Sequence, residues 1–212
     1  MFFDIHTHNP SELGLKAIRS LSIEEAEKVF SSSADGLFSV GFHPWYASEF
    51  STESFEKVEK WASDNRFIAI GECGLDKNSK APIEEQLEIF NMQIALSEKR
   101  EKPLIIHCVG CFNELLDLKR SLNPSQLWII HGFRGKPQLA KQALKAGCAL
   151  SFGEYFNAES VRVTPIEQLY VETDESELPI EQIYDAIAEA KGCNPNDLFA
   201  GEQFYQRFFN NK

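Results

Sequence analysis

Residues 67–76 read Phe-Ile-Ala-Ile-Gly-Glu-Cys-Gly-Leu-Asp, a short apolar run that leads into a carboxylate flanked by glycines. Short runs rich in apolar and β-branched side chains are typical of strands in a parallel sheet. An ionised carboxylate at the end of such a strand must be paired or bound to a metal ion, because burying it alone costs several kcal/mol. The stretch therefore predicts a buried strand with a polar site at its end.

Similar apolar runs recur along the whole chain, with helical patterns between them. The expected strands are residues 2–8, 37–43, 67–72, 104–108, 127–131, 148–152 and 169–174, with a short eighth at 198–201. A capping-box signature at residues 22–25 and Pro82 mark two helix starts, the second for a helix over 82–100. This alternation predicts one α/β domain over residues 1–212, a compact (β/α)8 barrel of the TIM type. An open doubly wound sheet is the alternative, although no glycine-rich phosphate loop follows any strand.

Composition restricts the class of protein. Of 212 residues, 43% are apolar and 25% are charged, as in a soluble globular domain. The 21 basic and 32 acidic residues give a net charge of −11, which disfavours a nucleic-acid coat or a binder of anionic membranes. The chain has five cysteines, an odd count, which favours a reducing compartment over a disulfide framework. We find no leader sequence and no apolar stretch of membrane length, so we expect a cytoplasmic protein. We expect no membrane association and no obligate protein partner.

All five histidines fall at the end of a predicted strand, and so do two carboxylates. These residues are His6, His8, His43, His107, His131, Glu72 and Asp174. In a (β/α)8 barrel the carboxyl ends of the strands face the active site, so we expect the seven side chains to meet there. For each residue alone, a structural role or a salt bridge is the alternative.

The N-terminal strand carries the most specific pattern, Asp4-Ile-His6-Thr-His8. Because strand side chains alternate with a period of two, Asp4, His6 and His8 project from one face, and the two imidazoles can bind one metal ion. Asp4 lies deeper in the barrel, where it either supports the site or makes core hydrogen bonds. Glu172 precedes Asp174 on the same face and is either a supporting residue or filler.

Neutral imidazoles and carboxylates are the ligands that Zn²⁺ prefers, and the carboxylates also admit Mn²⁺ or Mg²⁺. Four histidines together with Glu72 and Asp174 exceed one tetrahedral shell. We therefore expect two divalent ions about 3.5–4 Å apart, with Zn²⁺ favoured, the arrangement used to hydrolyse phosphate esters.

Six motifs together resemble the TatD-related family of metal-dependent hydrolases, a branch of the amidohydrolase-type barrels. They are Asp4-x-His6-x-His8, Gly41-x-His43-Pro44, Gly71-Glu-Cys-Gly-Leu-Asp76, the strand-end His107, His131-Gly-Phe133 and Glu172-Thr-Asp174. The resemblance spans nearly the whole chain and implies a distorted (β/α)8 barrel. Many members of the family are deoxyribonucleases that release nucleotides.

The resemblance also implies roles for the strand-end residues. His6 and His8 would bind one ion and His107 and His131 the other, with Glu72 bridging the two. Asp174 would bind the first ion and take protons from the attacking water, so that Asp174 and Glu72 are the expected catalytic residues. His43 would face the substrate near a phosphate.

The chain departs from the family pattern around the expected substrate site. Acidic Glu175-Ser-Glu177 replaces the basic segment that follows the Thr-Asp motif, and Cys108-Val-Gly110 replaces a motif with an arginine. Arg134 stands where family members usually carry a small polar residue, and it is either a substrate contact or a solvated loop arginine.

These features predict a metal-dependent phosphodiesterase or deoxyribonuclease that acts on DNA ends or on small nucleotide esters. A phosphoesterase of the PHP type is an alternative, but such enzymes usually end with an Asp-x-His pair, and no histidine follows His131. An amidohydrolase with a carbamylated lysine would need a lysine at a strand end. A barrel that binds without catalysis is the third alternative, and lost ligands would be its signature.

Overall fold

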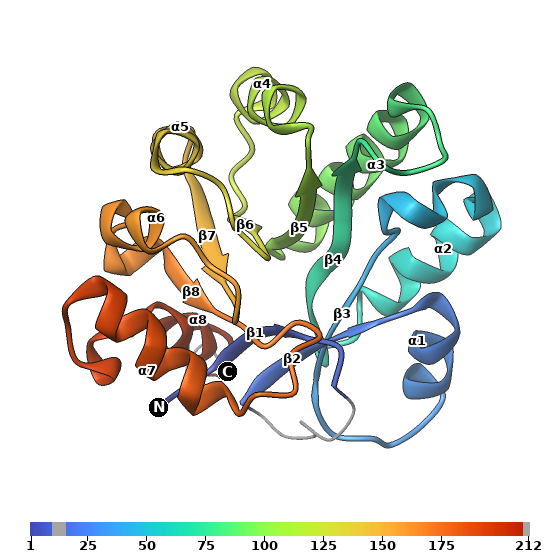
Figure 1. Ribbon diagram of the computed structural model, residues 1–212. Helices are drawn as coiled ribbons and strands as arrows, with labels where there is room; N and C mark the ends of the chain where they lie inside the picture. Colours follow the sequence, from blue (N-terminus) through green and yellow to red (C-terminus); the bar gives the residue numbers. More distant parts are fainter. Residues whose placement is uncertain (10–15, 210–212) are drawn as a thin grey trace. The chain divides into compact units, whose positions relative to one another are not determined.

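Eight strands form one sheet in which neighbours follow the order of the sequence, from β1 to β8. The computed structural model describes residues 1–9 and 16–209. The strands are β1 (Asp4–Thr7), β2 (Ala17–Leu21), β3 (Leu37–Val40), β4 (Phe67–Asp76), β5 (Leu104–Val109), β6 (Trp128–Ile130), β7 (Cys148–Phe152) and β8 (Leu169–Val171). Strand pairs β1–β2, β3–β4, β4–β5 and β7–β8 are parallel. With helices between the strands, this is the expected (β/α)8 barrel fold (Figure 1).

Helices alternate with these strands along the chain. They are α1 (Ile23–Phe30), α2 (Thr52–Trp61), α3 (Ile83–Arg100), α4 (Phe112–Leu122), α5 (Pro137–Lys145), α6 (Ala158–Val163), α7 (Ile180–Lys191) and α8 (Ala200–Phe209), with short 3-10 helices η1 (Pro44–Glu49), η2 (Ile166–Gln168) and η3 (Pro195–Asp197). The predicted capping box is present, because the Ser22 side chain and the Glu25 side chain each accept the other residue's amide hydrogen. Among the described residues, no helix combines the length and the apolar character needed to cross a membrane.

The chain divides into two compact units, and the boundaries fall within β2 and within β6. Unit 1 comprises residues 1–19 and 130–212, and unit 2 comprises residues 20–129. The single domain that the sequence predicts over the whole chain stays a prediction.

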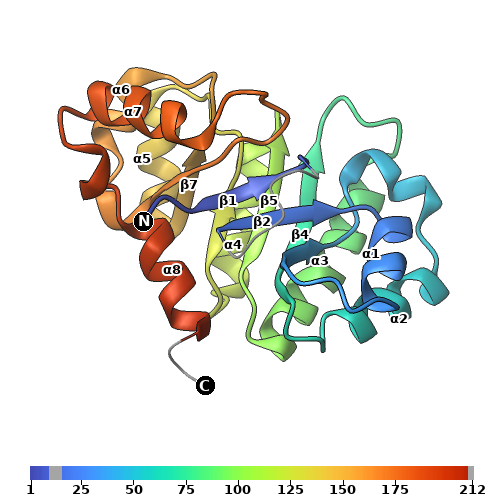
Figure 2. The same cartoon turned by 90° about the horizontal axis from the view of Figure 1, so that it is seen from below.

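In unit 1, β1 lies beside β2 (Figure 2). A parallel bridge between Thr7 and Asp174 places the end of β1 beside the segment that follows β8. The Tyr184 hydroxyl of α7 donates to the Phe3 carbonyl oxygen at 3.0 Å, which ties this helix to the start of the chain.

In unit 2, the long strand β4 pairs with β3 on one side and β5 on the other. A glycine at position 74 makes the pairing of β4 with β5 possible, since a side chain there would collide with the carbonyl oxygen of His107. Gly74 also has a φ of 130°, which side chains rarely adopt. The glycines that flank Glu72 therefore allow β4 to continue to Asp76, four residues beyond the predicted end.

The predicted eighth strand at residues 198–201 is wrong, because Ala200 begins α8 and the eighth strand is β2 at Ala17–Leu21. Leu198 and Ala200 are buried, and a short buried apolar run does not by itself distinguish a strand from a helix. Arg19 interrupts the apolar run of β2, which removed the pattern that would have predicted it. The other strands occur where expected, with ends that differ by a few residues, and α3 begins one residue after Pro82.

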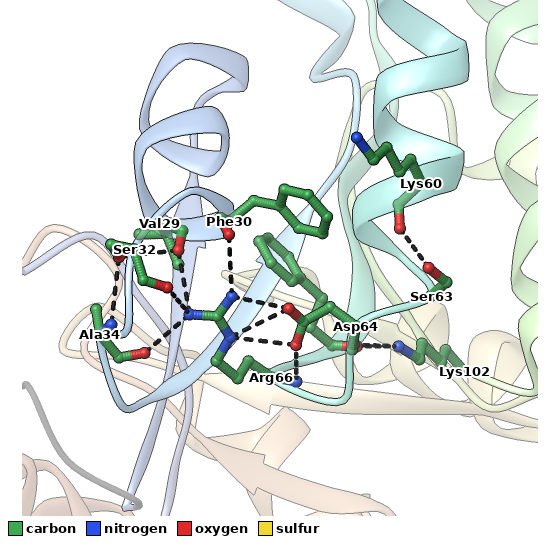
Figure 3. Close-up of polar contacts among 10 residues, drawn as sticks. Val29, Phe30, Ser32, Ala34, Lys60, Ser63, Asp64, Arg66 and Lys102 are labelled. Atoms are coloured by element: carbon green, nitrogen blue, oxygen red, sulfur yellow. Dashed lines mark hydrogen bonds and ion pairs between the residues drawn. The ribbon is translucent and has the colours of Figure 1, made fainter.

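Arg66 connects the end of α1 to the start of β4 in unit 2 (Figure 3). Its guanidinium donates to the carbonyl oxygens of Val29, Ser32 and Ala34 at 3.0–3.1 Å. The same group forms an ion pair with Asp64 at 2.8 Å. These bonds tie the end of α1 and the segment that follows it to the residue that precedes β4.

We expect Arg66→Ala to lower the free energy of unfolding by about 2–3 kcal/mol, because the half-buried acceptors of Val29 and Asp64 lose a charged donor. Urea denaturation followed by circular dichroism measures this change. Arg120→Ala is the control, since Arg120 is 55% exposed and forms an ion pair with Asp117 three residues earlier. The control should change stability by less than about 0.5 kcal/mol. Equal effects of the two substitutions would contradict the role given to Arg66.

Candidate metal centre

The end of β1 and the segment after β8 bring two histidines and an aspartate together in unit 1. The Asp174 amide donates to the His6 carbonyl oxygen at 3.0 Å, and the His8 amide donates to the Asp174 carbonyl oxygen at 2.9 Å. Asp174 has a φ of 55°, a left-handed conformation that aspartate tolerates better than most residues. Backbone bonds thus hold the Asp174 carboxylate between the two imidazoles.

The spacing of these three side chains suits a divalent ion. The Asp174 Oδ1 atom lies 3.5 Å from His6 Nε2 and 3.9 Å from His8 Nε2. Two ligands of a tetrahedral zinc ion with bonds of 2.0–2.1 Å lie about 3.4 Å apart, so these distances fit with small adjustments. His6 is buried, whereas His8 and Asp174 are 40% and 25% exposed, which leaves the cluster accessible from one side.

His131 and Glu172 belong to the same neighbourhood in unit 1. The His131 ring lies 4.3 Å from the His6 ring, and His131 Nδ1 lies 3.8 Å from Glu172 Oε1. Glu172 is fully buried and accepts a hydrogen bond from the Gly132 amide. With Asp174, these two residues also offer ligand atoms within 4.8 Å of one another. The structure therefore places Glu172 among the candidate ligands.

Asp4 links the start of β1 to the residue that precedes Asp174. Its carboxylate accepts the Thr173 hydroxyl at 2.6 Å and the Thr173 amide at 3.1 Å, directly before Asp174 in the chain. The Thr173 hydroxyl also lies 2.7 Å from the Thr7 hydroxyl. Burial raises the pKa of Asp4 to about 8, although the hydrogen bonds from Thr173 oppose this shift. Asp4 thus contacts Thr173, and it supports Asp174 through the backbone.

A second cluster lies in unit 2, around the carboxylate of Glu72 in β4. His107 Nδ1 lies 3.7 Å from Glu72 Oε1, and His107 Nε2 lies 2.9 Å from Asp76 Oδ2. Because a carboxylate only accepts, the His107 hydrogen lies on Nε2 and the lone pair of Nδ1 faces Glu72. A histidine oriented by a carboxylate in this way is the usual arrangement of a metal ligand.

His43 offers a ligand atom to the same cluster, with Nε2 3.8 Å from Glu72 Oε1. However, His43 Nδ1 accepts the Trp45 amide hydrogen at 3.1 Å. A neutral imidazole then carries its own hydrogen on Nε2, which cannot bind a metal ion but can donate to a phosphate oxygen. This geometry supports the predicted substrate contact of His43 over a ligand role.

Sequence reasoning gave no role to Asp76, which the structure places at the centre of the unit 2 cluster. Asp76 is 1% exposed and accepts from His107 and from the Trp45 indole nitrogen. Burial alone would raise the pKa of Asp76, but hydrogen bonds from the Asn78 amide, His107 and Trp45 hold this pKa below its ordinary value. Asp76 is therefore ionised at neutral pH. The sequence did carry a signal for this role, because Asp76 lies four residues after Glu72 in the same run and therefore on the same strand face.

Arg134 lies at a pocket of about 630 Å³ in unit 1 that Glu172 and Asp174 also line. Its guanidinium is stacked over the Tyr155 ring, 5.3 Å from the ring centre. Carboxylates of Glu154, Glu175 and Glu177 line the same pocket. The pocket thus combines one cation with several acids beside a candidate ligand.

The chain is similar to known proteins. A family model described as TatD related DNase matches residues 11–198. The 3'-5' ssDNA/RNA exonuclease TatD of Cronobacter sakazakii is 31% identical over 169 residues, which are 72% of this chain and 63% of that protein. An uncharacterized metal-dependent hydrolase of Bacillus subtilis, YabD, is 31% identical over 144 residues, 64% of this chain and 56% of that protein. The matched regions thus span less than two thirds of these relatives.

Solved structures show the same fold. The crystal structure of YJJV, a TatD homologue from Escherichia coli, has a TM-score of 0.82 at 18% identity and covers 98% of this chain and 96% of its own. A TatD-family hydrolase from Entamoeba histolytica has a TM-score of 0.75 at 17% identity, with 99% of this chain and 97% of its own covered. Because the family model that matches the sequence is that of TatD related DNases, the PHP-type alternative is set aside. The family model, which matches most of the sequence, shows that this chain belongs to the TatD-related family.

Proposed function

We propose that the protein is a metal-dependent phosphodiesterase that removes nucleotides from the ends of single-stranded DNA or RNA or cleaves small nucleotide esters. The observation that carries this proposal is the convergence of His6, His8 and Asp174 at the spacing of divalent-ion ligands. The names of the relatives, among them 3'-5' ssDNA/RNA exonucleases, support the substrate class.

We propose two divalent ions, with Zn²⁺ favoured and Mg²⁺ or Mn²⁺ as alternatives. His6, His8 and Asp174 of unit 1 would hold one ion, and the assignment of His107 and His131 to the other stays a prediction. The role of Glu72 as a shared ligand stays a prediction. When bound, such ions lower the pKa of a coordinated water and offset the charge of a phosphate oxygen.

Side chains of the protein then transfer the proton and bind the phosphate. Asp174 takes the proton of the attacking water, because its carboxylate is partly exposed at the pocket and is held in place by backbone hydrogen bonds. His43 of unit 2 donates from Nε2 to a phosphate oxygen. In unit 1, Arg134 is the cation of the pocket that Asp174 also lines, and it would bind a phosphate oxygen there.

The test is an assay of metal-loaded protein on end-labelled single-stranded oligonucleotides, on a nitrophenyl phosphodiester and on an amide. We expect release of mononucleotides, loss of this activity with a chelator and recovery with added metal. Turnover of the amide alone, or of no substrate, would overturn the proposal and would favour another hydrolase or a binding protein.

Asp174→Asn preserves the volume of the side chain but removes the proton acceptor. Because general-base catalysis contributes about 10²–10⁴-fold, kcat should fall by that factor, while metal content should fall less. Steady-state kinetics and elemental analysis of the same samples measure both. A variant with near-normal turnover would remove Asp174 from the mechanism.

Asp76→Asn tests the orientation of His107. The substitution removes the charge that holds the Nε2 hydrogen, so we expect metal affinity to fall by about 10–100-fold. Competition with a fluorescent zinc chelator measures the affinity. Asp117→Asn, at a side chain that is 76% exposed, is the matched control and should leave the affinity unchanged. An equal affinity of the Asp76 variant and the wild type would show that Asp76 has no such role.

Among the described residues that line the pocket beside Asp174, Arg134 is the one basic side chain, so binding of single strands should depend weakly on salt. Each neutralised phosphate contributes about −0.7 to the slope of log affinity against log salt, and we expect a slope of roughly −1 to −2. Arg134→Ala should raise KM for a nucleotide ester without changing metal content, and Lys141→Ala in α5 should change neither. A slope steeper than about −4, or an unchanged KM, would contradict the expected single-nucleotide contact.

A further inference from the structure

Trp45 is an exposed aromatic residue beside the unit 2 cluster. Of the three tryptophans of the chain, Trp61 and Trp128 are buried, whereas Trp45 is 58% exposed. It lies in η1, the short 3-10 helix that begins directly after His43. A single exposed apolar side chain is common on protein surfaces and needs no explanation by itself. The hydrogen bonds of Trp45 distinguish it from such a residue.

Three hydrogen bonds fix the position of Trp45 while its ring stays exposed. The indole Nε1 donates to Asp76 Oδ2 at 2.6 Å, and the Trp45 amide donates to His43 Nδ1 at 3.1 Å. The Ser79 hydroxyl donates to the Pro44 carbonyl oxygen at 2.7 Å, which anchors the preceding residue. A buried carboxylate that already holds His107 thus also holds the edge of the indole.

The fixed ring lies next to the side chains to which the proposed function gives roles. Its centre is 5.0 Å from the His43 ring and 6.1 Å from the His107 ring, both at steep interplanar angles. Because His43 Nδ1 accepts the Trp45 amide hydrogen, Nε2 of the neutral imidazole carries the hydrogen that can be donated to a phosphate oxygen. A flat apolar surface therefore adjoins a phosphate donor.

We propose that Trp45 stacks on an unpaired nucleobase of the substrate while His43 contacts the phosphate of the same nucleotide. This inference rests on the proposed function and narrows its substrate class to nucleotides with an accessible base. Every base has a flat face, so stacking gives affinity without sequence preference, typically about 5- to 150-fold for each base. With a net charge of −11, the chain has few phosphate contacts available, and stacking supplies the affinity that charge does not.

The fixed position of the indole favours binding of a base. A ring that is already held loses little conformational entropy when a base packs on it. The hydrogen bond to Asp76 holds one edge of the ring, while Trp45 as a whole is 58% exposed. Tyr46, the next residue, is 55% exposed, and its ring lies 6.1 Å from His43. Tyr46 therefore serves as a neighbouring aromatic control.

The experiment measures binding of deoxyadenosine monophosphate, which has no phosphodiester bond to cleave, to metal-loaded protein. Ribose 5-phosphate is the ligand without a base. The nucleotide should quench the tryptophan fluorescence of the wild type, whereas the sugar phosphate should not, because it has no base to stack. Since Trp61 and Trp128 are buried, the quenching reports on Trp45. Calorimetry gives Kd values for variants that lack the fluorophore.

Trp45→Leu should raise the Kd of the nucleotide by about 5- to 150-fold and leave that of ribose 5-phosphate unchanged. Trp45→Phe keeps an aromatic face and should show a smaller rise, which separates lost stacking from misfolding. Tyr46→Leu should change Kd by less than about 2-fold, below the stacking range. An unchanged nucleotide Kd in Trp45→Leu, or equal losses for both ligands, would overturn the inference.

The failures of the two proposals are distinguishable. If the wild type cleaves oligonucleotides and Trp45→Leu keeps the wild-type KM and nucleotide Kd, the stacking role alone is overturned. If the wild type cleaves no phosphodiester but the nucleotide still binds with the predicted dependence on Trp45, the hydrolase proposal fails and the stacking role is supported.

Discussion

The parallel bridge between Thr7 and Asp174 is the interaction on which the candidate centre in unit 1 depends. It places the Asp174 amide against the His6 carbonyl and the Asp174 carbonyl against the His8 amide, so one stretch of backbone sets the positions of three candidate ligands. Asp4 reinforces this bridge by holding both the hydroxyl and the amide of Thr173. Ligand spacing is thereby fixed by main-chain bonds, which are more rigid than surface side chains.

Carboxylates orient the aromatic side chains of the unit 2 cluster in a similar way. Asp76 accepts from both His107 and Trp45, so one buried charge sets the tautomer of a candidate ligand and the position of an exposed ring. The Trp45 amide in turn sets the tautomer of His43. A neutral imidazole offers one donor and one acceptor, and these bonds therefore decide which histidine can bind a metal ion and which can donate to a substrate.

The sequence predicts the barrel and the strand-end residues because both follow from short-range patterns. Apolar runs between helical segments indicate the parallel sheet, and histidines or carboxylates at the ends of most of these runs indicate the edge that carries the site. β2 was missed because Arg19 breaks its apolar run, and a run at residues 198–201 was misread because buried helix starts look the same. The tautomer of His43 and the shared use of Asp76 depend on three-dimensional contacts among η1, β4 and β5, which no local pattern encodes.

The central claim is that the strand-end histidines and carboxylates bind divalent ions. The most direct measurement is native mass spectrometry of the chain after removal of metal with a chelator and reloading with Zn²⁺. The account predicts two zinc ions on the wild type, and at least one fewer on a chain in which His6 and His8 are both replaced by alanine. A wild-type chain that retains no zinc, or a variant that retains as many ions as the wild type, would contradict it.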